Sequence, residues 1–150
     1  MSASSSTLAA RVQPSGVALA GSGPVVLLGR LFFVLIFVMS GPRHFTSQLI
    51  GYGAAQGVPM ASIVVPCAGL LALAGGLSIL LGFRAKLGAW LIVLFLLGVT
   101  PTMHNFWAVS DPMMYQIQFA HFLKNVSMLG GALLITQFGS GPWSLDGRGK

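Results

Sequence analysis

Acidic residues are almost absent from this chain of 150 residues, which contains two Asp and no Glu. Charged residues of both signs make up only 7% of the sequence, and hydrophobic residues make up 55%. Since roughly 25% of the residues in a soluble domain are charged, this composition excludes an ordinary water-soluble protein. At this length we expect one domain, embedded in a lipid bilayer.

Several chemical motifs are also missing. The single Cys67 cannot form an intrachain disulfide, a Cys-x-x-Cys redox pair or a thiolate metal cluster. There is no phosphate-binding Walker loop, no dinucleotide fingerprint and no esterase elbow. The apolar blocks contain no carboxylate for ion-coupled transport, and two of them have almost no polar residue to line a channel. Any redox reaction would therefore need a cofactor that is not formed from the chain's own residues.

Four apolar blocks are long enough, or nearly so, to cross a membrane. They span residues 25–41, 60–81, 87–103 and 112–138, and the third is expected to bend or end near Pro101. Asp111 and Pro112 form a typical helix start before the fourth block. The sequence thus predicts an all-α bundle of four transmembrane helices at residues 24–139, between a flexible tail at 1–23 and a C-terminal tail at 140–150.

Basic residues are unevenly shared between the two predicted sides of the membrane. They are scattered singly or in pairs, so no nucleic-acid partner is expected despite the net charge of +6. Only Arg43 falls in the loops opposite the termini, so the positive-inside rule predicts that both termini are cytoplasmic. The basic residues on the side of the termini are Arg11, Arg84, Lys86, Arg148 and Lys150.

Small residues recur along the second block. Because helices in lipid have little hydrophobic drive to associate, close backbone approach at small residues holds them together. The residues expected to pack in this way are Ala68, Ala72, Gly75 and Gly76.

The fourth block carries polar residues on one helical face. Gln118, His121, Lys124 and Asn125 lie at helical spacing, and this face is too polar to face lipid tails. Residues placed in this way suit either a ligand site or hydrogen bonds inside the bundle, and both readings stay open. Lys124 is the leading candidate for ligand binding.

The first block offers a second polar line, which includes Arg30 and His44. Arg30 is a further ligand-binding candidate, but lipid phosphate or Asp146 would also suit its charge. His44, His104 and His121 lack a short paired spacing, so we expect no metal site.

The order of several short motifs resembles that of the DoxX family of small bacterial membrane proteins, from about Leu28 to Asp146. The matching motifs are Gly29-Arg30-Leu31, Ser40-Gly41, Gly51-Tyr52, Gly57-Val58-Pro59, Gly75-Gly76, Leu81-Gly82-Phe83-Arg84, Lys124-Asn125, Gly130-Gly131 and Ser144-Leu145-Asp146. The resemblance implies a four-helix bundle in the bacterial inner membrane. It also implies an association with membrane redox systems such as thiosulfate:quinone oxidoreduction. Many relatives carry a Glu shortly before the paired glycines, where this chain has Leu71 to Ala74.

Two functional hypotheses follow. In the first, the chain is a non-catalytic subunit that anchors or assembles a membrane redox system with other protein subunits and holds a quinone or lipid. In the second, it is a quinone-reactive oxidoreductase in which Lys124, Asn125 and His121 donate to quinone oxygens. Quinone is the candidate cofactor, and no cofactor is certain.

Overall fold

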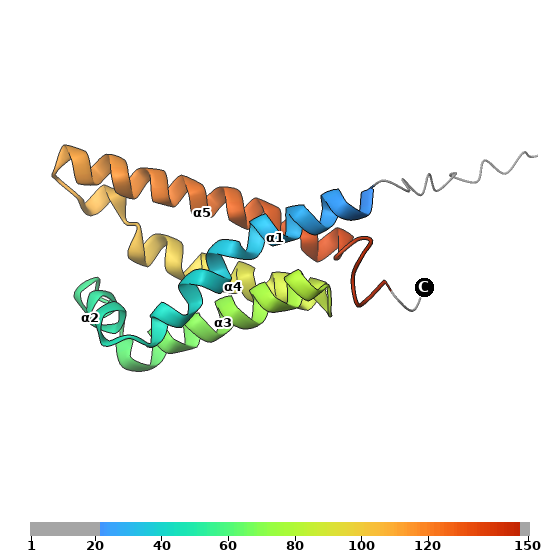
Figure 1. The fold of residues 1–150 in the computed structure, drawn as a ribbon. Helices are drawn as coiled ribbons and strands as arrows, with labels where there is room; N and C mark the ends of the chain where they lie inside the picture. Colours follow the sequence, from blue (N-terminus) through green and yellow to red (C-terminus); the bar gives the residue numbers. More distant parts are fainter. Residues whose placement is uncertain (1–21, 148–150) are drawn as a thin grey trace, which may run out of the picture.

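A bundle of four long helices makes up most of the computed structural model, which describes residues 22–147 (Figure 1). The long helices are α1 (Ser22–Ser40), α3 (Ala61–Leu81), α4 (Ala85–Met103) and α5 (Pro112–Phe138). Each is long and apolar enough to cross a membrane, and residues 22–147 contain no strand. The predicted all-α fold with four transmembrane helices is confirmed. Most of the predicted N-terminal tail, residues 1–21, lies outside the described residues.

The helix ends lie close to the predicted positions. α1 begins at Ser22, and α4 begins at Ala85 and continues through Pro101 to Met103. Asp111 caps α5 as predicted, because its Oδ1 accepts a hydrogen bond from the Met114 amide at 2.8 Å. Capping satisfies one of the amides that the first helical turn leaves unpaired.

The segment between the first two long helices is helical, whereas the sequence predicted only a loop at residues 42–59. It contains the 3₁₀ segment η1 (Gly41–Phe45) and the short helix α2 (Ser47–Ala55), which Thr46 caps. A second 3₁₀ segment, η2 (Phe106–Ala108), precedes α5. These pieces are too short to show a helical period in the sequence. They bring side chains of residues 41–55 against the ends of α3 and α4.

α3 contacts its neighbours at small residues. A Cβ atom on Gly75 would lie 2.7 Å from the carbonyl oxygen of Gly88 in α4, and one on Gly76 would lie 3.1 Å from Cγ2 of Val38 in α1. Ala72 is fully buried, and Ala68 packs against the core. The backbone of α3 therefore approaches α4 on one side and α1 on the other.

α5 is held mainly by α4, and it makes little direct contact with α1. Gly131 is one meeting point, where a Cβ atom would lie 2.9 Å from the ring of Phe33. Figure 1 shows α1 crossing α5 near the end where the described chain begins and then diverging from it toward α2. The bundle is thus less tightly closed at its α2 end.

The C-terminal segment folds back over the turn between α3 and α4. The amides of Leu145 and Asp146 donate to the carbonyls of Leu81 and Gly82 at 3.2 and 2.9 Å. The Asp146 carboxylate accepts hydrogen bonds from the Arg84 and Ala85 amides at 3.0 and 3.3 Å. Asp146, one of the two partners considered for Arg30, therefore caps the start of α4 and is hydrogen-bonded to the Arg84 and Ala85 amides instead.

Gly75→Ala should lower the free energy of unfolding by about 1–3 kcal/mol, because the added methyl group overpacks the contact with the Gly88 carbonyl. The measurement is thermal unfolding in mild detergent. Unfolding is monitored as the loss of the folded peak in gel filtration. Gly98→Ala in α4 is the matched control, since a Cβ atom there meets nothing within 4 Å. Equal melting of the two variants would contradict this account of the packing.

Candidate functional site

A cavity of about 280 Å³ lies between α1, α2, α4 and α5, at the end of the bundle opposite Ser22 and Gly147. Its walls are largely apolar and include Phe37, Phe95 and Met128. Seven polar or charged residues from five segments also line it. They are Ser40, Arg43, His44, Tyr52, His104, Lys124 and Asn125. An apolar cavity with a few converging polar groups is the usual form of a small-molecule site.

Asn125 is the unusual residue in this cavity. Its side chain is only 4% exposed, and it makes no hydrogen bond to any other residue of the described chain. The amide is not sealed from solvent, because the fully buried side-chain atoms without a partner among residues 22–147 are Nε and Nη1 of Arg30. The amide is therefore available to a ligand in the cavity.

Lys124 lies beside Asn125 and begins a line of polar side chains that leads away from the cavity. Its Nζ lies 3.3 Å from Nδ1 of His121, and the rings of His121 and His104 are 5.2 Å apart. Nδ1 of His104 lies 2.9 Å from Oε1 of Gln118. Since an amide oxygen only accepts, this His104 nitrogen carries the proton. The four residues connect the cavity to the loop before α5.

His44 is buried at the opposite wall. Its Nδ1 donates to the carbonyl of Ser40 at 3.0 Å, and its ring packs edge-on against Phe95. In the neutral ring this tautomer leaves Nε2 as a hydrogen-bond acceptor. Gly69 of α3 allows the close approach, because a Cβ atom there would lie 2.5 Å from Cβ of His44. The cavity thus offers acceptors as well as donors.

Arg30 does not belong to this site. It precedes His44 by 14 positions, or about 20 Å along a helix. Its Nη2 donates to the carbonyl of Trp143 at 2.5 Å, near the other end of the bundle. Its Nε and Nη1 are buried without a hydrogen-bond partner among residues 22–147. The structure therefore separates Arg30 from the α5 residues with which the sequence grouped it.

The structure adds lining residues that the helical pattern did not reveal. Arg43 lies in η1, and Tyr52 lies in α2, which the sequence assigned to a loop. No group of three metal-ligating side chains occurs among residues 22–147, because His44 lies apart from the paired His104 and His121. Gln118 lies at the end of the line of polar side chains that is nearest the loop before α5.

The sequence profile of the DoxX family matches residues 25–105, slightly more than half of the chain. The inner membrane protein YqjF of Escherichia coli (strain K12) is 30% identical over 123 residues, which cover 81% of this chain and 88% of YqjF. The chain belongs to the DoxX family. The ER-derived vesicles protein ERV29 of Saccharomyces cerevisiae is 27% identical over 81 residues, which cover 54% of this chain and 26% of ERV29. No solved structure matches the chain.

The DoxX match and the four apolar helices establish a multi-pass membrane protein. The matched segment contains α1, α3 and α4, and it ends before α5 begins. Residues 25–105 therefore supply the part of the lining that comes from α1, η1, α2 and α4, and Lys124 and Asn125 come from outside the matched segment.

Asn125→Leu should stabilise the ligand-free DoxX protein by about 1 kcal/mol, because leucine has a similar shape and no buried polar group left unpaired. Thermal unfolding of delipidated protein measures this change. Ser127→Ala is the control, since Ser127 is exposed and bonds only the carbonyl of Leu123 in its own helix. A clearly less stable Asn125→Leu variant would show that the amide has a structural role.

Proposed function

We propose that this DoxX-family protein is a non-catalytic membrane subunit that holds the headgroup of a quinone in the cavity beside Lys124 and Asn125. The observation that carries the proposal is the buried Asn125 amide, which has no partner in the described chain and lines an apolar cavity. A quinone ring would fill the apolar space, and its carbonyl oxygens would supply the missing acceptors.

The charges of the cavity favour an oxygen-bearing ligand without a positive charge. Lys124 and Arg43 both line it, and its lining contains no carboxylate. A lysine ammonium only donates, and the amide group of Asn125 donates through nitrogen and accepts through oxygen. With Nε2 of His44 as a further acceptor, the same cavity suits both a quinone and the corresponding quinol.

The open side of the bundle supports access from the bilayer. Because α1 and α5 make little direct contact and both line the cavity, we propose that a lipid-soluble ligand enters between them. Ile36, which lines the cavity from α1, is partly exposed and would form the lip of this entrance.

An anchoring role fits the lack of a complete catalytic set. The cavity combines hydrogen-bond donors and acceptors with no thiol, carboxylate or metal cluster among its described lining residues. Electrons for quinone reduction would therefore have to come from a partner subunit. We accordingly place the protein within a membrane redox assembly, where it positions the quinone for a partner.

Protein purified in mild detergent should retain quinone that organic extraction releases. Asn125→Leu and Lys124→Met should each lower the quinone content at least tenfold, because they remove polar partners in an apolar site. Ser127→Ala should retain it. A quinone-free wild-type protein, or an Asn125→Leu variant with unchanged quinone, would refute the proposed ligand.

The same preparations test the two functional hypotheses. Copurification of redox subunits, identified by mass spectrometry, is expected for the anchoring role. Turnover of a soluble quinone with thiosulfate by the isolated chain would instead establish the enzyme. An isolated, quinone-free monomer without turnover would contradict both.

We further propose that the protein lies in the bacterial inner membrane with both termini in the cytoplasm. The name of the relative YqjF and the basic residues Arg84 and Lys86 near the terminal end support this placement. In a Cys67→Ala background, Ser47→Cys in α2 should react with a membrane-impermeant maleimide in spheroplasts. Leu145→Cys should react only after the cells are lysed. The reverse pattern would invert the topology.

A further inference from the structure

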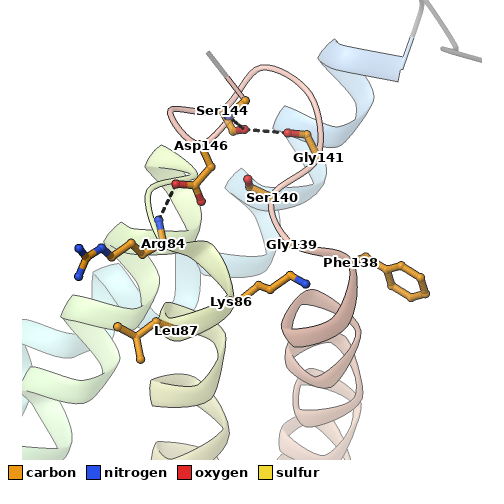
Figure 2. Close-up of a pocket in the computed structure, with 10 residues that line it drawn as sticks. Arg84, Lys86, Leu87, Phe138, Gly139, Ser140, Gly141, Ser144 and Asp146 are labelled. Atoms are coloured by element: carbon orange, nitrogen blue, oxygen red, sulfur yellow. Dashed lines mark hydrogen bonds between the residues drawn. The ribbon is translucent and has the colours of Figure 1, made fainter. Parts of the chain in front are cut away.

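A second cavity, of about 680 Å³, lies at the terminal end of the bundle. It is bordered by the start of α4, the end of α5 and the folded-back segment 140–147 (Figure 2). It is well separated from the cavity beside Asn125, and no part of the proposed function uses it. Its polar and charged lining residues are Arg84, Lys86, Ser140, Ser144 and Asp146.

Lys86 supplies an uncommitted positive charge to this cavity. Its side chain runs from α4 toward the end of α5, and a Cβ atom on Gly139 would lie 3.5 Å from its Cε (Figure 2). Among residues 22–147, its ammonium group has no carboxylate or hydrogen-bond partner. Lys86 is an exposed residue whose stem lies near Gly139, so its ammonium group is accessible to a ligand in the cavity.

Ser140 supplies a neutral donor. The residue is only 7% exposed, yet its hydroxyl group makes no hydrogen bond within the described chain. Ser144, which is equally buried, differs because its hydroxyl donates to the carbonyl of Gly141 at 2.8 Å. The Ser140 hydroxyl therefore lines the cavity without a partner in the described chain, and it stays accessible there, since the fully buried unpartnered atoms are Nε and Nη1 of Arg30.

The remaining charges around the cavity favour an anion. Both oxygens of Asp146 are occupied by the Arg84 and Ala85 amides, so this carboxylate is already stabilised at the start of α4. Arg30 is buried behind the same turn, where its guanidinium group lies against Gly82 near Ser144. Among residues 22–147, Lys86 and the buried Arg30 thus add positive charge near the cavity, while the Asp146 carboxylate is already hydrogen-bonded.

Apolar side chains extend the cavity toward the lipid. Leu87 and Phe138 border it, and they are 55% and 80% exposed. Both belong to membrane-spanning helices, α4 and α5. A molecule that combines a phosphate with hydrocarbon chains would contact both the polar and the apolar residues of this cavity. Free phosphate would contact only the polar ones.

We propose that this cavity binds an anionic phospholipid, with Lys86 and Ser140 donating to the headgroup phosphate and Leu87 and Phe138 contacting the acyl chains. Lysine and hydroxyl donors are common partners of phosphate oxygens. The bound lipid would connect the C-terminal turn to α4 and α5.

Native mass spectrometry of the delipidated full-length protein tests this site. Phosphatidylglycerol should bind more tightly than phosphatidylcholine with the same acyl chains. Lys86→Gln should weaken phosphatidylglycerol binding about tenfold, because it removes a charge-assisted hydrogen bond. Ser140→Ala should weaken it about threefold to tenfold for loss of a neutral donor.

Two matched variants separate the site from general charge effects. Arg84→Gln removes the same charge from the same turn; Arg84 also borders the cavity, but its side chain points away from Lys86 and Ser140 in Figure 2 and lies over the Phe83 ring. It should change binding less than twofold at physiological salt, where distant charges are screened. Ser127→Ala on the exposed face of α5 should have no effect.

Equal losses in Lys86→Gln and Arg84→Gln, or no preference for phosphatidylglycerol, would overturn the proposal. Displacement of the lipid by excess inorganic phosphate, together with phosphate binding on its own, would overturn the lipid assignment in favour of a soluble anion. Thermal unfolding of each variant verifies that it is folded, so a loss of binding reports on the cavity itself.

Discussion

The close approach of α3 to α4 at Gly75 and Gly88 is the contact on which the arrangement of the bundle depends. In a bilayer, lipid tails compete with apolar side chains on equal terms, so helices associate where small residues allow extensive contact. α3 uses a neighbouring glycine, Gly76, to hold α1 on its other side. α1 and α4 are therefore both fixed by α3, while α5 is held chiefly by α4.

This chain of contacts explains why cavities occur at both ends. α1 and α5 are joined through α3 and α4, and direct contact such as that of Phe33 with Gly131 is sparse. At the α2 end the two helices diverge. Polar residues line the cavity at this end. At the terminal end, segment 140–147 folds over the α3–α4 turn and encloses the second cavity.

Each cavity is lined by a largely buried polar residue whose side chain has no hydrogen-bond partner in the described chain, Asn125 at one end and Ser140 at the other. Unpaired buried groups reduce stability, so folded proteins contain few of them, and those that occur need a physical explanation. A nearby lysine accompanies each one, Lys124 in the first cavity and Lys86 in the second. The DoxX match covers α3, α4 and most of α1, whereas Lys124, Asn125 and Ser140 lie beyond the matched residues.

The sequence by itself determined the membrane environment, the four long helices and the polar face of α5. Hydrophobic length and helical period depend only on neighbouring residues, and the capping of α5 by Asp111 is equally local. The tertiary structure decided that His44 and Tyr52 join Lys124 and Asn125, that Arg30 lies apart from them, and that Asp146 caps α4. These outcomes depend on how distant segments pack, and η1 and α2 are too short to carry a periodic signal. A helical pattern in the sequence specifies which face of a helix is polar. Only the tertiary packing specifies which residues contact that face.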